Sequence, residues 1–254
     1  MQKKYSILFF GFLISGIVFL YFFLPHKYTQ HSIHDIYEYS EINFNTIDYA
    51  IAKIPPEHIA SLHFYYKNEE NQKFTDINHL KKEKQNLIFA TNAGIFSRTY
   101  EPLGLYIQND ITISNINTST GEGNFYLEPN GVFFIKKDEA TIIETNAFQH
   151  DADIAYAIQS GPVLVTNNTI HPLFNKDSEN KFIRNGVGID TDGNIIFAIS
   201  NTPVSFYEFA SFFKEKLNCP NALYLDGAIS EMYVPGYREH TKEKFGVIIG
   251  ILDQ

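Results

Sequence analysis

Alternating apolar and polar positions, together with short runs of β-branched and aromatic residues, recur along most of the chain and predict many short strands. Turn sequences separate these runs. Asp190-Thr191-Asp192-Gly193, for example, predicts a tight hairpin, because glycine tolerates the positive φ that such a turn requires. The clearest predicted strands are Asp48–Ala52, Ser61–Tyr66, Leu87–Thr91, Gly104–Gln108, Gly131–Ile135, Thr141–Glu144, Ile154–Ser160, Gly186–Asp190, Ile195–Ser200, Leu223–Asp226 and Phe245–Leu252.

Two stretches have a helical period instead. The first, Ile77–Lys84, follows Thr75-Asp76, and the second runs from Pro203 or Ser205 to Leu217. Ser205 and Glu208 have the spacing of a capping box, in which each side chain bonds the other's backbone. The apolar residues of the second helix fall on one face and predict a core contact: Phe206, Phe209, Ala210, Phe213 and Leu217. The fold class predicted is α+β, a large, mostly antiparallel twisted sheet with few packed helices.

A different pattern opens the chain. Lys3 and Lys4 precede the uncharged apolar run Ser6–Leu24, whose length matches the hydrocarbon core of a bilayer. The run stays bulky to its end and no small-residue cleavage site follows, which favours a signal anchor over a cleaved signal peptide. Lysines before the run should stay in the cytoplasm, so we expect a membrane-anchored domain on the extracytoplasmic side, periplasmic or cell-surface. The predicted division is an anchor over residues 1–25, a tether over 26–44 and one domain over 45–254.

The charged and metal-binding residues narrow the classes of partner. The net charge is −9 and there is no basic stripe, so nucleic acid is not an expected partner. Cys219 is the single cysteine, which excludes an intramolecular disulfide and a thiolate metal site, and we expect it to be a small buried apolar residue. The nine histidines show no metal-ligand spacing. No cofactor is predicted, although Asp, Asn and backbone oxygens would suit calcium or magnesium.

Candidate site residues stand where predicted strands end in a glycine beside a polar side chain. Rigid strand ends are common places for catalytic groups, although each such motif alone is also an ordinary turn. Asp226 follows an apolar strand, so its carboxylate requires a partner, for which Arg184 is the natural choice. We expect Asn92, Arg184 and Asp226 to converge on one pocket. The motifs are Asn92-Ala93-Gly94, Ser160-Gly161-Pro162, Arg184-Asn185-Gly186 and Asp226-Gly227.

In this order along the chain, the motifs resemble the phosphodiester glycosidase domain, a family that includes the lysosomal-pathway "uncovering enzyme" and many bacterial envelope proteins. The resemblance spans about Asn45 to Leu252. Many members read Asp-Gly-Gly-Gly-Ser-Ser where this chain continues Asp226-Gly227-Ala228-Ile229-Ser230, and Glu128 replaces an expected lysine, so substrate identity does not carry over. The matching stretches are Asn92–Phe96, Gly104–Tyr106, Gly123–Phe133, Gln159–Val165, Arg184–Ile189 and Leu225–Gly227.

The resemblance implies a hydrolase that cleaves a sugar-1-phosphodiester at the anomeric carbon and releases a sugar and a phosphomonoester in the cell envelope. Phosphate leaves readily, so such a site has to stabilise developing charge more than it has to donate a proton. Asp226 would act as base or nucleophile, Arg184 would hold the phosphate, and Glu231 would be a second carboxylate. The expected substrate-binding residues are Asn92, Gly94, Asn130, Ser160, Gly161 and Gly227.

Two other functions stay open from the sequence. The domain could bind a sugar phosphate or phosphoglycan of the envelope without turnover. It could also be a metal-assisted phosphodiesterase that cuts the P–O bond, with calcium or magnesium held by oxygen ligands. In each case the expected partners are a sugar-phosphate or phosphoglycan substrate and, through the N-terminal helix, a membrane.

Overall fold

The computed structural model describes residues 31–226, 229–239 and 243–253, which belong to one compact unit starting at His31. The predicted anchor, residues 1–25, and Gly227 lie outside these residues. Within the part of the chain that is described, no helix is long and apolar enough to cross a membrane.

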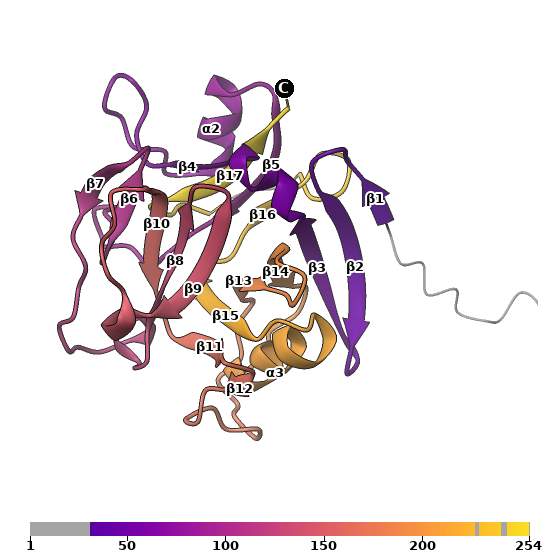
Figure 1. Cartoon of the computed structure of the whole chain (residues 1–254). Coiled ribbons are helices and arrows are strands. Elements are labelled where there is room, and N and C mark those ends of the chain that lie inside the picture. The colour runs from indigo at the N-terminus through magenta and orange to yellow at the C-terminus, as the bar shows by residue number, and fades with distance from the viewer. Residues whose placement is uncertain (1–30, 227–228, 240–242, 254) are drawn as a thin grey trace, which may run out of the picture. The chain divides into compact units, whose positions relative to one another are not determined.

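The strands form three antiparallel sheets in place of the single large sheet that we expected (Figure 1). The eight-stranded sheet has the order β1 (His31–Ile33), β2 (Glu38–Phe44), β3 (Ile47–Ile54), β14 (Ile195–Ser200), β13 (Asn185–Ile189), β15 (Asn221–Asp226), β11 (Val163–Thr166) and β12 (Thr169–Ile170). The five-stranded sheet has the order β7 (Ile111–Ser114), β6 (Tyr106–Gln108), β10 (Ile154–Ser160), β8 (Gly131–Lys136) and β9 (Glu139–Glu144). The four-stranded sheet has the order β16 (Met232–Tyr233), β5 (Leu87–Asn92), β17 (Ile248–Leu252) and β4 (Leu62–Tyr65).

Each predicted strand overlaps a strand of the structure, and the Asp190–Gly193 turn joins β13 to β14 as expected, with Gly193 at a φ of 84°. The prediction of a tether over residues 26–44 is wrong where β1 and β2 stand. Strand β2 pairs along its whole length with β3, and Tyr37 and Tyr39 are buried. These two tyrosines supply apolar surface that lets an otherwise polar segment join the sheet. The domain therefore begins before residue 45.

Both predicted helices are present. In α2 (Ile77–Glu83) the Asp76 side chain caps the backbone N–H of His79 at 2.7 Å. Helix α3 (Phe206–Ser211) begins with the predicted capping box between Ser205 and Glu208 and continues as a π-helix over Phe212–Lys216. Its aromatic face lies on the eight-stranded sheet, where the rings of Tyr49 and Phe212 stack 3.8 Å apart. Three short 3-10 helices complete the description: Pro56–Ser61, Asn124–Tyr126 and Thr145–Ala147.

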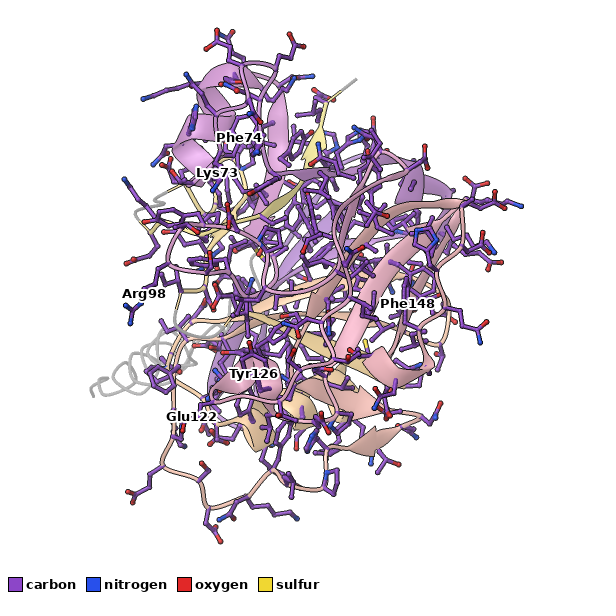
Figure 2. The ribbon with its side chains drawn as sticks, turned by 90° about the vertical axis from the view of Figure 1, so that its left-hand side faces the viewer. Lys73, Phe74, Arg98, Glu122, Tyr126 and Phe148 are labelled. Atoms are coloured by element: carbon purple, nitrogen blue, oxygen red, sulfur yellow. The ribbon has the colours of Figure 1, made fainter. Side chains whose placement is uncertain are left out.

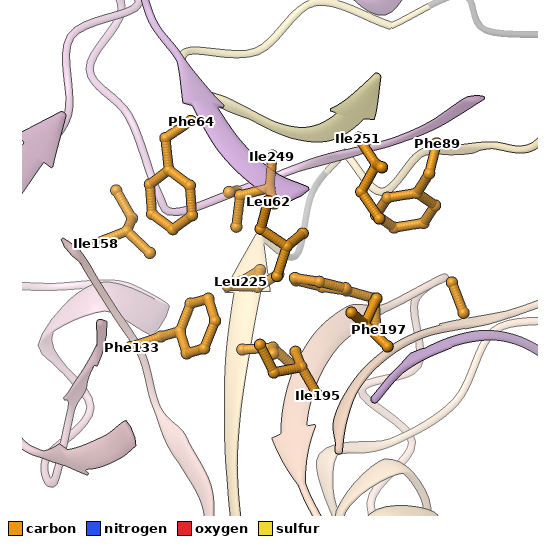
Figure 3. Packing of buried hydrophobic residues seen from close by; sticks show 14 of the residues in the cluster. Leu62, Phe64, Phe89, Phe133, Ile158, Ile195, Phe197, Leu225, Ile249 and Ile251 are labelled. Atoms are coloured by element: carbon orange, nitrogen blue, oxygen red, sulfur yellow. The ribbon is translucent and has the colours of Figure 1, made fainter. Parts of the chain in front are cut away.

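The main core lies where the three sheets meet, and Figure 3 shows its side chains converging from each of them. Phe197 of the eight-stranded sheet is central. Its ring centroid lies 5.4 Å from that of Phe89 in the four-stranded sheet and 6.2 Å from that of Phe133 in the five-stranded sheet. Losing one such buried ring typically costs about 3–5 kcal/mol. The core therefore fixes how the sheets sit relative to one another, and with them the strand ends discussed next.

Candidate functional site

The candidate site lies where the four-stranded sheet meets the eight-stranded sheet. Strand β5 ends at Asn92, β13 begins at Asn185, and β15 ends at Asp226. Asn185 and Asp226 are paired across the sheet, beside a bulge in the pairing of β13 with β15. Chain segments almost a hundred residues apart are therefore brought together by strand register, as the strand-end motifs led us to expect.

Asn92 is fully buried, and its side-chain amide bonds the segment that follows Asp226. Its Nδ2 donates to the carbonyl oxygen of Ile229 at 2.6 Å, and its Oδ1 accepts the backbone N–H of Glu231 at 2.8 Å. The hydroxyl of Thr91 also donates to the carbonyl oxygen of Glu231 at 2.8 Å. Strand β5 therefore holds the backbone on both sides of Ser230 in a fixed place.

Asn185 is the connecting residue of this network, and sequence reasoning did not single it out. It is 1% exposed. Its Nδ2 lies 2.8 Å from the carbonyl oxygen of Asn92, 3.0 Å from Asn92 Oδ1 and 3.1 Å from Thr91 Oγ1. Its Oδ1 accepts the backbone N–H of Asp226 and the hydroxyl of Ser230, each at 3.2 Å. The available signal was an amide at the start of a buried strand, directly after Arg184.

Arg184 belongs to the other face of the eight-stranded sheet. It is fully buried, and its guanidinium lies 3.7 Å from the ring centroid of Phe206. The Nε donates to the carbonyl oxygen of Val204 at 2.8 Å, one Nη donates to the hydroxyl of Tyr224 at 2.9 Å, and the other donates to Asn180. Among the described residues Arg184 forms no ion pair, so the expected pairing with the Asp226 carboxylate is replaced by neutral partners.

The charges of Arg184 and Asp226 act on Tyr224 in opposite directions. Burial raises the pKa of its hydroxyl well above the usual value, the Arg184 guanidinium opposes that rise, and the Asp226 carboxylate adds to it. Burial also lowers the pKa of Arg184, and Tyr224 offsets part of that effect. Arg184 is thus a buried cation that contacts β15 through the Tyr224 hydroxyl, on the face of the sheet opposite the Asn92 network.

The other predicted residues surround the same junction and are used for internal contacts. Ser160 donates its hydroxyl to the carbonyl oxygen of Leu225 at 2.6 Å, directly before Asp226. Asn130 donates to the carbonyl oxygen of Phe125 at 2.9 Å. A Cβ at Gly161 would lie 2.5 Å from the Cβ of Asn130, and a Cβ at Gly94, whose φ is 68°, would lie 2.6 Å from Ile158. Both glycines are therefore required for close packing of the strands.

A cavity of about 450 Å³ opens beside this network. Glu231 is the predicted site residue that lines it, and Ser230, which also lines it, donates its hydroxyl to the carbonyl oxygen of Asp226 at 2.8 Å. Glu231 Oε1 accepts the backbone N–H of Glu243 at 2.9 Å. Arg238, a residue that the sequence reasoning missed, stands in the same wall. The described lining is Ser230, Glu231, Met232, Tyr237, Arg238, Glu239 and Glu243.

A larger hollow of about 660 Å³ lies between β4, α2 and β10, and none of the predicted site residues lines it. It contains a chain of hydrogen bonds in which His63 Nδ1 lies 3.0 Å from the hydroxyl of Tyr156, which donates to Asn109. In the described part of the chain, no group of three or more His, Cys, Asp or Glu side chains is arranged to hold a metal ion. Cys219 is buried, as predicted, and burial raises the pKa of its thiol.

Comparison with known proteins decides the family. The sequence profile of the phosphodiester glycosidases matches residues 85–250, more than half of the chain and all of the junction just described. The chain belongs to the phosphodiester glycosidase family. It is 44% identical over 147 residues to the uncharacterized protein YigE of Escherichia coli K12, and the aligned part covers 58% of this chain. The chain therefore spans about 58% of the length of the curated relative it matches.

Two solved structures share the fold of this phosphodiester glycosidase family member. The catalytic domain of zebrafish N-acetylglucosamine-1-phosphodiester alpha-N-acetylglucosaminidase, described as auto-inhibited by its pro-peptide, aligns with a TM-score of 0.59 and 14% identity over 91% of this chain and 85% of that one. A protein of Burkholderia pseudomallei K96243, described as exported, aligns with a TM-score of 0.56 and 10% identity over 82% of this chain and 74% of that one. At these identities the likeness is one of fold.

Within the phosphodiester glycosidase fold, the motifs quoted from the sequence meet at one junction, but their side chains divide between two faces. Asn92 and Asn185 form the network, Ser160 bonds the strand before Asp226, and Arg184 lies behind the sheet. The backbone that the network holds after Asp226 is that of residues 229–231. Ser230 and Glu231 of this stretch line the cavity.

Proposed function

We propose that this protein hydrolyses a sugar-1-phosphodiester at the anomeric carbon and releases a sugar and a phosphomonoester. The observation that carries this proposal is the buried amide network of Asn92 and Asn185, which holds the backbone of Asp226 and of residues 229–231 beside a 450 Å³ cavity. These residues include two carboxylates, Asp226 at the end of β15 and Glu231 in the cavity wall, in a chain whose family is the phosphodiester glycosidases. Preorganised charges next to a cavity are what a glycosidase needs.

The reaction places few demands on a proton donor. As the bond from the anomeric carbon to the phosphate oxygen breaks, the electron pair leaves with the phosphate and the sugar ring becomes oxocarbenium-like. A carboxylate on the sugar side stabilises that positive charge and either removes a proton from the attacking water or attacks the carbon itself. We assign this role to Asp226 and keep Glu231 as the second carboxylate.

The amides take positioning roles in this proposal. Asn92 is 0% exposed and both ends of its side-chain amide are already bonded to backbone groups of residues 229 and 231. Ser160 and Asn130 also spend their side chains on internal hydrogen bonds. We therefore infer that these residues hold the carboxylates in place, and that contact with the substrate falls to Asp226 and to the residues that line the cavity.

The bond that is cut can be identified with water labelled with heavy oxygen. We expect the purified protein, given a panel of sugar-1-phosphodiesters, to place the label in the released sugar, because water or the carboxylate attacks carbon. Mass spectrometry of the two products measures this. Label in the phosphomonoester would instead show P–O cleavage and a phosphodiesterase, and binding of these compounds without any product would show a binding module.

We also infer that residues 1–25 anchor the domain on the extracytoplasmic side of a membrane, supported by Lys3 and Lys4 before an uncharged apolar run. Protease added to intact spheroplasts should then remove the domain, while a cytoplasmic marker protein stays intact. Immunoblotting against the domain measures the loss. Full protection of the domain, or its recovery in the soluble exported fraction, would overturn the anchor.

A further inference from the structure

The chain has three arginines, and each lies in a different environment. Arg98 is exposed and projects from the surface (Figure 2). Arg184 is fully buried behind the eight-stranded sheet. Arg238 is half-buried and lines the cavity beside Glu231. Among the described residues that line this cavity, Arg238 is the one with a cationic side chain.

The backbone around Arg238 is fixed by a tight turn. The N–H of Val234 donates to the carbonyl oxygen of Arg238 at 2.9 Å, and the N–H of Arg238 donates to that of Val234 at 2.8 Å. Gly236, inside the turn, has a φ of 77°, which favours glycine. The neighbouring ring of Tyr237 packs against that of Tyr39, with centroids 4.9 Å apart. The guanidinium therefore projects from an ordered support.

The partners of the Arg238 side chain are neutral. One Nη donates to Asn201 Oδ1 at 2.8 Å, just after the end of β14. Burial and the Glu41 carboxylate, which accepts the Tyr39 hydroxyl at 2.8 Å, raise the pKa of that hydroxyl, and the Arg238 guanidinium opposes the rise. Arg238 forms no ion pair with any residue that the structure describes. No carboxylate of the described residues therefore lies within ion-pair distance of its guanidinium.

The Nε of Arg238 supplies a second observation. It is shielded from solvent and has no hydrogen-bond acceptor within the described ranges. A buried N–H without an acceptor costs about 1–3 kcal/mol, so such groups usually have a ligand or a function. The planar fork of a guanidinium matches the oxygens of a phosphate, which it can bind through two parallel hydrogen bonds.

We propose that Arg238, and not Arg184, binds the phosphate group of the substrate, and that the adjacent carboxylate wall receives the sugar. This proposal rests on the proposed function. The cavity has the matching polarity, because Arg238 is its cation while Glu231 and Glu243 also line it. Glu239, also in the lining, turns back to accept the N–H of Gly236 at 2.8 Å. When the phosphate of the substrate binds Arg238, the sugar ring lies beside the carboxylates. These stabilise the positive charge that the ring develops.

The carboxylates of Glu231 and Glu243 also favour a ligand with a single negative charge over a dianion. A free phosphate dianion would meet their repulsion throughout, whereas a phosphodiester carries a single charge and places its neutral sugar towards them. We therefore expect the site to prefer diesters to inorganic phosphate. Inorganic phosphate should still bind weakly, in competition with the diester, and this makes it a probe of Arg238 that does not depend on turnover.

The experiment compares Arg238→Gln and Arg238→Lys with the matched control Arg98→Gln, which makes the same change on the exposed surface. We expect Arg238→Gln to lower kcat/KM for a sugar-1-phosphodiester about 10- to 100-fold, the loss of a charge-assisted pair of hydrogen bonds. Arg238→Lys should recover part of that loss, and Arg98→Gln should stay within about twofold of the wild type. Thermal melts of the variants exclude unfolding as the cause.

A further variant, Asn201→Asp, tests the charge without touching Arg238. It replaces the neutral partner at 2.8 Å with a carboxylate in the same place, which should pair with the guanidinium and weaken binding of the anion. We expect a raised KM and weaker inhibition by inorganic phosphate, with kcat less affected. An unchanged KM in this variant and in Arg238→Gln would overturn the proposal.

Binding of inorganic phosphate, followed by phosphorus NMR titration, separates this proposal from the proposed function. If no diester is hydrolysed but phosphate binds the wild type and not Arg238→Gln, the hydrolase proposal fails and the role of Arg238 stands. If diesters are hydrolysed equally well by Arg238→Gln, the hydrolase stands and the role of Arg238 is wrong. The role of Arg238 is also wrong if Arg184→Gln abolishes phosphate binding while Arg238→Gln preserves it. It is wrong as well if the wild type neither binds phosphate nor turns over a diester.

Discussion

Asp226→Asn should lower the turnover of a sugar-1-phosphodiester at least about 100-fold while the substrate still binds, because positioned proton transfer alone contributes about that much. The substitution keeps the shape of the side chain and removes its charge. Steady-state kinetics should show the loss in kcat with KM little changed. If Asp226 is instead the nucleophile, the loss is larger, because no covalent intermediate can form.

The control for this variant is Asp192→Asn, the same chemical change in the exposed turn between β13 and β14. It should leave both kinetics and melting temperature unchanged. Asp226 is 5% exposed, so its own variant requires a melt beside the kinetics. A wild-type rate with an unchanged melt would make Asp226 a structural residue, and Glu231→Gln would then be the variant to measure.

Asn185→Ala should lower the free energy of unfolding by about 3 kcal/mol, since it leaves several buried partners of one amide without hydrogen bonds. Those partners belong to Thr91, Asn92, Asp226 and Ser230. For a domain of this size the melting temperature should fall by about 6–12 °C. Activity measured below the melting temperature should fall as well, because the backbone next to the two carboxylates loses its hydrogen bonds.

Asn43→Ala is the matched control, since the Asn43 amide makes one exposed hydrogen bond, to Asp48 at 2.7 Å. Its effect should stay within about 0.5 kcal/mol. Calorimetry or a dye-based melt distinguishes the two. Equal melting temperatures for the two variants would show that the amide network contributes little to the fold and that Asp226 and residues 229–231 are held by other contacts.

Local patterns in the sequence predicted much of the fold. The capping box of Ser205 and Glu208 and the turn at Asp190–Gly193 depend on neighbouring residues, and both formed as expected. Strand β2 was missed because its buried residues, Tyr39 and Ser40, sit among polar ones that suggest solvent. The partition into three sheets depends on pairing between distant strands, which no local pattern contains.

The sequence predicted that these strand ends meet, but not which of their side chains face one another. Successive side chains of a strand point to opposite faces, so of the adjacent residues Arg184 and Asn185 one had to face away from the Asn92 network. The search for polar residues at strand ends selected Arg184, whereas the strand register places Asn185 in the network with Asn92. Arg238 follows a short strand in a segment with no strong periodicity, so its approach to Glu231 depends on the tertiary fold alone.

The position of β17 determines when the four-stranded sheet can form during synthesis of the chain. Residues 248–252 lie between β4 and β5 in the four-stranded sheet and supply hydrogen bonds to β5, which carries Asn92. A nascent chain that has not yet released these residues from the ribosome lacks the inner strand on which β5 rests. The four-stranded sheet therefore cannot close until residues 248–252 have been made and released.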